Sequence, residues 1–142
     1  MDPAATDDVL VIALDRWGRA LVAVAREVDG PGRLPGGAVA ALESPDEAAI
    51  RCFEEASGCL LEQLQLFRAY RPSEREADRG RGERLHVYFD DPDLDLAAIT
   101  EDAAAEWAYL APVDLGGQRL LSEHRNVLDE FMVSNAYRAL FH

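Results

Sequence analysis

The stretch from Gly37 to Cys59, GAVAALESPDEAAIRCFEEASGC, carries the strongest structural signal in the sequence. Within it, Ser44 is followed directly by Pro45, and Glu47 stands three residues after Ser44. A serine at the N-cap, a proline at the first helical position and a glutamate at the third form a capping box. Because this arrangement satisfies backbone N–H groups at a helix start, it predicts a helix that begins after Ser44.

The predicted helix runs to about Ser57 and ends at Gly58, since glycine readily adopts the left-handed conformation that terminates helices. The segments around it are rich in β-branched residues or alternate in polarity, which predicts strands. These segments are 7–15, 20–28, 59–71, 84–90 and, with a turn at its end, 106–115. We predict a further helix from Ser122 to the end of the chain, with the apolar stripe that a core-facing helix shows. Its members are Val127, Leu128, Phe131, Met132 and Leu140.

The connections and one strand face are also predicted. The residues between the first two strands include a glycine and suggest a hairpin. The Pro/Gly-rich run 30–37 and the polar run 72–83 are expected to be loops, the second mobile and solvated. In 84–90, the apolar positions alternate with His86 and Tyr88, the pattern of a half-buried strand. We expect His86 to be a hydrogen-bonded, half-buried residue.

Length and composition indicate one soluble α/β or α+β domain that spans residues 1–142. The chain carries a net charge of −13, from 27 acidic residues against 14 basic ones. Such a charge repels phosphate backbones, so general nucleic-acid binding is not expected. No apolar run approaches the roughly 20 residues of a membrane span, and the N-terminus lacks the basic start of a signal peptide. We therefore expect a cytoplasmic protein with reduced thiols and no membrane contact.

The stretch that begins at Gly37 resembles the Nudix box. That pattern is Gly, five residues, Glu, seven residues, then Arg-Glu-apolar-x-Glu-Glu-x-Gly-apolar. The positions that match it are Gly37, Glu43, Arg51, Phe53, Glu55 and Gly58. The resemblance implies a Nudix-type α/β/α sandwich, with a mixed central sheet between the box helix and the C-terminal helix. It also implies hydrolysis of a nucleoside diphosphate linked to another group, with Mg²⁺ as cofactor.

Two positions depart from the pattern, because Cys52 and Ala56 stand where the family has glutamates. Positions 52, 55 and 56 share one helix face, so carboxylates there would form an oxygen cluster suited to Mg²⁺. In this chain only Glu55 remains, and a thiol is a poor ligand for Mg²⁺. Glu55 with a backbone carbonyl near Gly37 is the metal site that we predict, and we expect it to be weak. We expect Cys52 to be a small packed residue rather than a nucleophile.

Neighbouring acids do not repair the loss. Glu54 lies roughly 200° from position 52 at about 100° per residue, so it points away from the site. Glu43 and Arg51 are retained, and in the family they pair to brace the loop against the helix. Outside the box, Glu106 matches a position near the family's site and is the first candidate for a recruited acid, whereas other acids near it are more often surface residues.

The predicted site therefore has three groups of residues. Those predicted for catalysis are Glu55, Arg51, Glu43 and Glu106. Those predicted to contact the ligand are Arg26, Gly36, Gly37 and Arg68. Those predicted to hold the metal are Glu55 and Gly37.

Three functions stay open. The first is recognition of a nucleotide or related phosphate ligand with absent or weak hydrolysis. The second is an active Mg²⁺-dependent hydrolase that uses Glu55 with an acid such as Glu106. The third is an interaction module that forms a homodimer through the terminal helix or an outer strand. The substitutions at Cys52 and Ala56 favour the first.

Overall fold

A computed structural model describes seven segments of the chain: 7–14, 19–23, 32–61, 64–75, 84–90, 107–110 and 120–140. Its strands are β1 (Asp8–Ile12), β2 (Ala20–Ala23), β3 (Gly36–Ala38), β4 (Gln65–Tyr70), β5 (Leu85–Phe89) and β6 (Trp107–Leu110). Its helices are α1 (Pro45–Ser57), the short 3-10 helix η1 (Pro72–Glu74), α4 (Ser122–Met132) and α5 (Asn135–Leu140). No helix among these segments is both long and apolar enough to span a bilayer.

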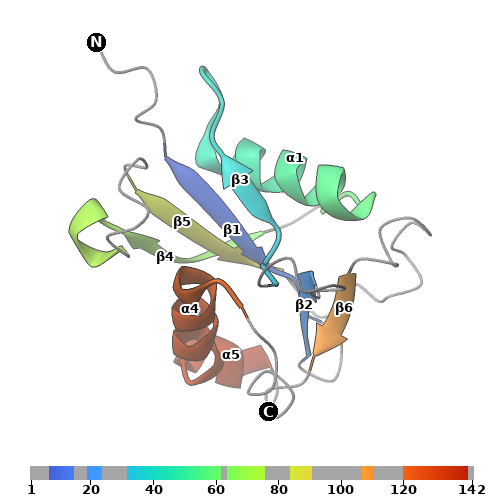
Figure 1. The fold of residues 1–142 in the computed structure, drawn as a ribbon, viewed down its shortest axis with the longest axis vertical. Coiled ribbons are helices and arrows are strands. Elements are labelled where there is room, and N and C mark those ends of the chain that lie inside the picture. Colours follow the sequence, from blue (N-terminus) through green and yellow to red (C-terminus); the bar gives the residue numbers. More distant parts are fainter. Residues whose placement is uncertain are drawn as a thin grey trace.

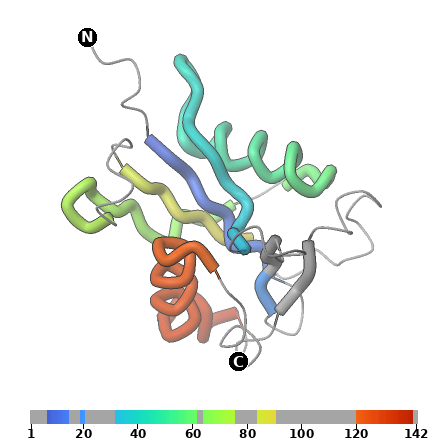
Figure 2. Tube along the Cα trace, in the orientation of Figure 1, coloured from blue at the N-terminus to red at the C-terminus, as the bar shows by residue number. Residues whose placement is uncertain are grey.

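A mixed four-stranded sheet lies at the centre, in the order β3-β1-β5-β4 (Figures 1 and 2). β1 and β5 are parallel, and the other two pairs are antiparallel. β2 pairs instead with β6 in a separate two-stranded sheet. The predicted hairpin between the first two strands is therefore reduced to one antiparallel bridge, Leu14 to Ala20. β1 lies between β3 and β5, and four of its five residues are buried, as expected for a central strand covered on both faces.

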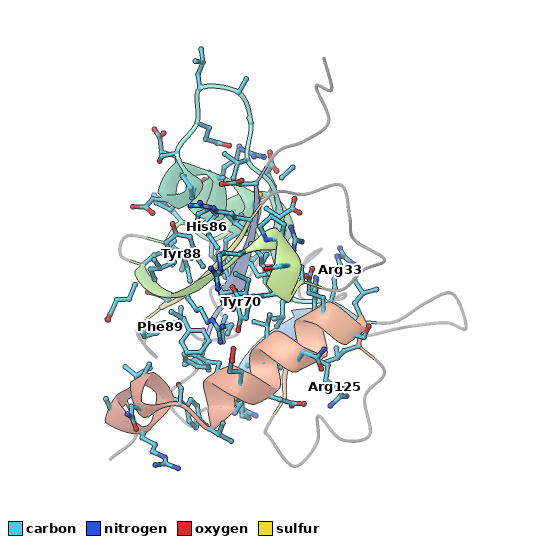
Figure 3. All side chains as sticks on the ribbon, turned by 90° about the vertical axis from the view of Figure 1, so that its left-hand side faces the viewer. Arg33, Tyr70, His86, Tyr88, Phe89 and Arg125 are labelled. Carbon is cyan, nitrogen blue, oxygen red and sulfur yellow. The ribbon has the colours of Figure 1, made fainter. Side chains whose placement is uncertain are left out.

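α1 covers one face of this sheet and α4 covers the other, which confirms the predicted sandwich (Figure 1). β5 shows this arrangement most clearly, because Tyr88 belongs to the core cluster of α1 whereas Val87 and Phe89 belong to that of α4. Figure 3 shows His86 and Tyr88 on the α1 side and Phe89 towards the C-terminal helices. The predicted half-buried strand is thus wrong for Tyr88, which is 4 % exposed. The Tyr88 hydroxyl donates a hydrogen bond to the Asp46 carboxylate at the start of α1.

The box helix forms as its sequence predicts. The Ser44 hydroxyl accepts from the N–H of Glu47, the Glu47 carboxylate accepts from the N–H of Ser44, and Pro45 occupies the first turn. Gly58 ends the helix at φ 78°, in the left-handed region. Phe53 and Cys52 face the sheet with two alanines of the first turns. Capping and burial therefore agree on the position and the rotation of α1.

Two predicted boundaries are wrong beside this helix. Gly36 and Gly37, expected in a loop, belong to β3 and pair with Leu10 and Val9 of β1. A Cβ atom at Gly36 would lie 2.2 Å from the carbonyl oxygen of Val9. Only glycine permits so close an approach of the two backbones. The strand predicted over 59–71 is shorter at its start, because β4 begins at Gln65.

The C-terminal helical region also differs from its prediction. It divides at Val133 and Ser134 into α4 and α5, and the Ser134 hydroxyl accepts from the N–H of Tyr137. The predicted apolar stripe is confirmed: Val127, Leu128 and Phe131 are buried, while Met132 and Leu140 pack against the same cluster. The break turns α5 so that the Tyr137 ring meets Phe131 edge-on, with centroids 5.7 Å apart.

The run after β4 is not the solvated loop that its composition suggests, at least in its described part. Its first residues form η1, and the Arg75 side chain is only 5 % exposed. The guanidinium donates to both carboxylate oxygens of Glu123 on α4, at 2.9 Å each. Its Nη1 atom lies 3.0 Å from Oδ2 of Asp8 on β1. Arg75 therefore ties β1, η1 and α4 together, while residues 76–83 lie outside the described segments.

Candidate functional site

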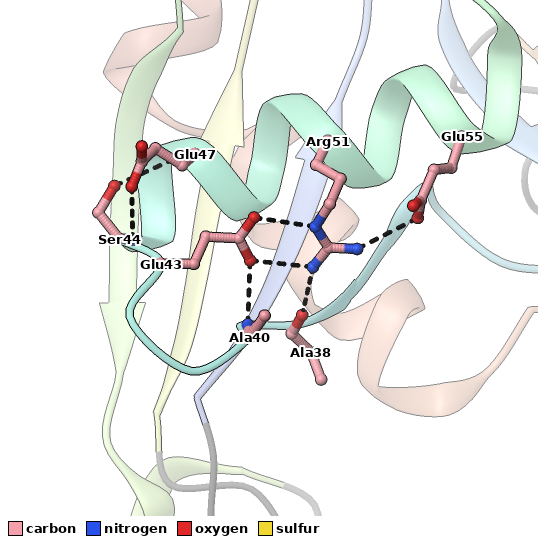
Figure 4. A network of polar contacts seen from close by, with 7 residues as sticks. All are labelled: Ala38, Ala40, Glu43, Ser44, Glu47, Arg51 and Glu55. Carbon is pink, nitrogen blue, oxygen red and sulfur yellow. Dashed lines mark hydrogen bonds and ion pairs between the residues drawn. The ribbon is translucent and has the colours of Figure 1, made fainter.

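A network of polar contacts joins the loop after β3 to the exposed side of α1 (Figure 4). Arg51 donates from Nε to Glu43 Oε2 at 2.9 Å and from Nη2 to Glu43 Oε1 at 3.0 Å. Nη2 also donates to the carbonyl oxygen of Ala38 at 2.9 Å. Glu43 in turn accepts from the N–H of Ala40 at 2.9 Å. The predicted pair is therefore present, and it ties both ends of the 38–43 loop to the helix.

Each member of the Glu43–Arg51 pair stabilises the charged form of the other. Hydrogen bonds from Arg51 hold the pKa of Glu43 below its ordinary value. Reciprocally, the hydrogen bonds to Glu43 raise the pKa of Arg51. Both side chains therefore stay charged in the folded protein near neutral pH. We call the four residues Ala38, Ala40, Glu43 and Arg51 the loop brace.

Glu55 lies one turn further along α1 and touches the loop brace. Its Oε1 atom accepts from Arg51 Nη1 at 3.2 Å, and its side chain is 64 % exposed. Exposed pairs at this i,i+4 spacing contribute about 0.3–0.5 kcal/mol. The one carboxylate that survives on the predicted metal face is thus in contact with a guanidinium.

Cys52 is packed, as predicted. It is 6 % exposed and belongs to the core cluster beneath α1. A Cβ atom at Gly37 would lie 3.0 Å from its Sγ atom, so the thiol fills the space above Gly37. Burial raises the pKa of the Cys52 thiol, which keeps it protonated and unreactive. Ala56, the other departure, is partly buried and packs on the same cluster.

These residues fit a divalent metal poorly. Mg²⁺ takes six oxygen ligands and usually one or two protein carboxylates. Here a neutral thiol and a methyl group flank a single carboxylate that an arginine already contacts. Within the described segments, no three His, Cys, Asp or Glu side chains stand close enough to hold a metal. The donor set therefore does not match the cofactor that the family resemblance implies.

The structure brings together only some of the predicted site residues. Glu43, Arg51 and Glu55 are in contact, while Gly36 and Gly37 precede Ala38 of the loop brace on β3. Arg68 does not join them, because it lies on β4 at the other edge of the sheet. It pairs there with Glu130 and Glu74, at 2.6 Å each, above the ring of Tyr70. Arg26 and Glu106 lie outside the described residues.

A pocket of about 140 Å³, which the sequence did not predict, lies between α4 and the start of β5. The residues that line it are Tyr70, Glu74, Leu85, Glu123, Asn126, Val127 and Glu130. Its acids are engaged: Glu123 with Arg75, and Glu130 with Arg68 and the Tyr70 hydroxyl. The spacing of Glu123, Val127 and Glu130 places all three on one helix face. That spacing could have indicated the pocket, because two acids on the same helix face as a buried valine need polar partners on the elements that pack against the helix.

Acid is expected to weaken the fold through the carboxylates that are paired. Burial raises the pKa of Asp7, but hydrogen bonds from His86, at 2.8 Å, and from the N–H of Arg84 outweigh it and leave the pKa lowered. A backbone hydrogen bond from Arg71 likewise lowers the pKa of Glu74. Together with Glu43, these groups bind protons more readily when unfolded. Their stabilisation is therefore complete above the unfolded values of 3.8 and 4.5 and is lost as pH falls through the lower folded values.

The measurement is the midpoint of urea unfolding at pH 7, 5, 4 and 3. We expect little change from pH 7 to 5 and a steep fall below. Asp7→Asn should remove part of the pH dependence, whereas Glu54→Gln, which changes an exposed acid, should not. A midpoint that stays constant down to pH 3 would contradict the assignment.

Comparison with known proteins agrees with this architecture. The NUDIX domain model matches residues 5–131. Among curated proteins, the chain is 26 % identical over 132 residues to the mRNA-decapping protein g5R of African swine fever virus. That match covers 84 % of this chain and 53 % of g5R, so the chain spans about half the length of that relative.

Solved structures show the same fold at low sequence identity. A MutT structure, from a study of the Aliivibrio salmonicida and Vibrio cholerae proteins, superposes with a TM-score of 0.68 at 18 % identity and covers 89 % of this chain and 95 % of that one. The NUDIX domain of Shewanella oneidensis NrtR, solved with ADP ribose, superposes with a TM-score of 0.66 at 15 % identity, over 92 % and 91 % of the two chains. Since the family model spans most of the sequence and the sandwich is shared, the chain belongs to the Nudix family.

Proposed function

We propose that this Nudix chain recognises a nucleoside diphosphate-linked or related phosphate ligand and has absent or weak metal-dependent pyrophosphohydrolase activity. One observation carries the proposal: the pair that holds the box loop is assembled, whereas Cys52 and Ala56 occupy two of the three acidic positions of the metal face and leave Glu55 as its one carboxylate. Glu43 and Arg51 hold the loop against α1. On the adjoining face, Cys52 is buried against Gly37 and Ala56 packs on the core.

The ligand class rests on the family. The NrtR domain cited above was solved with ADP ribose, and MutT shares the fold. Gly36 and Gly37, which are predicted to contact the ligand, lie on β3 at the start of the box. ADP-ribose is therefore the first ligand to test.

Other partners follow from composition. NrtR has also been solved with a 27-mer DNA, but this chain covers only 59 % of that longer protein. With a net charge of −13, we propose that this chain does not bind nucleic acid in general and that it acts in the cytoplasm. A homodimer stays a prediction, and sedimentation of the purified protein would measure its oligomeric state.

The test compares the natural protein with Cys52→Glu/Ala56→Glu across a panel of nucleoside diphosphate derivatives. Formation of the nucleoside monophosphate product is measured in Mg²⁺, and ADP-ribose binding is measured by calorimetry. We expect the natural protein to bind and to turn over at least about 10-fold more slowly than the double variant, since loss of even a residue that supports a metal ligand typically costs 10–100-fold. Thermal unfolding of both proteins establishes that they are folded.

A matched variant separates the alternatives. Robust turnover by the natural protein would contradict the proposal and favour the second candidate, an active hydrolase with a recruited acid. In that case Glu106→Gln should abolish turnover, while Glu101→Gln, a change five residues earlier, should not. Absence of binding to every member of the panel would contradict the ligand class itself.

A further inference from the structure

We infer that Glu55 is a positioning residue of the loop brace, holding Arg51 in place, rather than a metal ligand. The inference rests on the proposed function and deepens it, because it assigns the surviving box acid to the shape of the 38–43 loop. The donor set around Glu55 disagrees with the metal that the family implies, and the contacts of Arg51 supply the alternative role.

The donors of Arg51 show what Glu55 contributes. Nε and Nη2 are occupied by Glu43 and by the Ala38 carbonyl. Nη1 donates to Glu55 at 3.2 Å, the third acceptor around the same guanidinium (Figure 4). A planar guanidinium with its fork of donors is fixed in orientation when several sides are bound. Glu55 therefore fixes the outer edge of the Arg51 plane.

A metal ion bound to Glu55 would have to break the contact between Glu55 and Arg51. A divalent cation on Glu55 would stand beside the guanidinium of Arg51, and like charges repel at such a distance. The groups that would share the ion with Glu55 are the buried thiol of Cys52 and the methyl group of Ala56. Neither offers oxygen, which Mg²⁺ requires. The local chemistry favours the arginine as the partner of Glu55.

The 38–43 loop contains a residue in a strained backbone conformation. Leu42 has φ 66°, in the left-handed region, and its side chain is fully exposed. A leucine in that conformation is strained and gains nothing from burial. The turn that contains it is closed by a hydrogen bond from the N–H of Glu43 to the Ala40 carbonyl, at 3.1 Å. The loop brace holds this turn, and Glu55 acts on it through Arg51.

The experiment compares Glu55→Gln with Glu54→Gln, an equal change at the neighbouring exposed position. ADP-ribose affinity is measured in Mg²⁺ and again in EDTA, and Mn²⁺ binding to each protein alone is measured by electron paramagnetic resonance. A positioning role predicts that Glu55→Gln weakens ADP-ribose binding by no more than about fivefold, by the same factor in both buffers, with Mn²⁺ binding unchanged. Hydrogen exchange of the Ala40 and Glu43 amides should accelerate in Glu55→Gln and not in Glu54→Gln.

The opposite pattern would overturn the inference. A metal ligand predicts a loss of about 10–100-fold in Mg²⁺ only, together with weaker Mn²⁺ binding and unchanged amide exchange. If ADP-ribose binds none of the proteins in either buffer, the proposed ligand is wrong, and the Mn²⁺ titration and the exchange rates still decide the role of Glu55. Both substitutions preserve side-chain size at exposed positions, so both variants are expected to fold.

Discussion

Replacement of Arg75 by methionine is expected to lower the free energy of unfolding by about 3–5 kcal/mol, the usual effect of removing one partner of a buried ion pair. The side chains of Arg75 and Glu123 are 5 % and 8 % exposed, and Arg75 binds both oxygens of Glu123. Without the guanidinium, the Glu123 carboxylate would be left charged and buried between α4 and the sheet. The hydrogen bonds to Glu123 raise the pKa of Arg75, as expected for a stabilised charge.

Urea unfolding measures the effect, and Arg71→Met is the matched control. Arg71 also contacts an acid, Glu74, but its side chain is 74 % exposed, so its loss should cost under about 1 kcal/mol. Arg75→Met/Glu123→Met removes both buried charges and should recover most of the loss, because apolar replacements of buried pairs are often neutral. Equal effects at positions 71 and 75 would refute the buried-pair account.

Replacement of Gly36 by alanine is expected to destabilise the fold by about 3 kcal/mol, the upper part of the range for overpacking. The new Cβ would lie 2.2 Å from the Val9 carbonyl oxygen and 3.1 Å from the Cα of Leu10. Both are backbone atoms, so relief requires β3 to move away from β1. Because the 38–43 loop begins at the end of β3, the same change should weaken ADP-ribose binding.

Gly37→Ala provides the comparison one residue later. Among the described residues, its Cβ would meet the Cys52 sulfur at 3.0 Å and no backbone atom, and a side chain can yield more easily than a backbone. We expect a smaller loss, and Cys52→Ala should relieve it, giving a favourable coupling in a double-mutant cycle. Gly36→Ala should show no such relief. A Gly36→Ala protein as stable as the natural one would contradict the close approach of the strands.

The parts that sequence analysis predicted well depend on neighbours along the chain. The start and end of α1 follow from Ser44, Pro45, Glu47 and Gly58, which act within one turn of the helix. Because local geometry determines these features of α1, no knowledge of the distant chain was needed for them. The pairing of Glu43 with Arg51 was implied by the family resemblance.

The parts that it missed depend on residues far apart in sequence. The glycine between the first two strands suggested a hairpin, but a turn signal does not say which strands share a ladder. Arg75 stood in a run of mixed charge, and nothing near it indicated a buried partner at Glu123, on α4. Arg68 was assigned to the ligand, whereas its partners lie on α4 and η1. Tertiary contacts decided each of these cases.

The parallel pairing of β1 with β5 has a kinetic consequence. Asp8 lies opposite Leu85 and Ile12 opposite Phe89, so each pair is separated by 77 positions along the chain. Contacts between such distant residues slow folding, because a long loop must close before they form. During synthesis, β1 leaves the ribosome long before β5 exists. β1, with four buried apolar residues, must therefore remain without its parallel partner until β5 has been made.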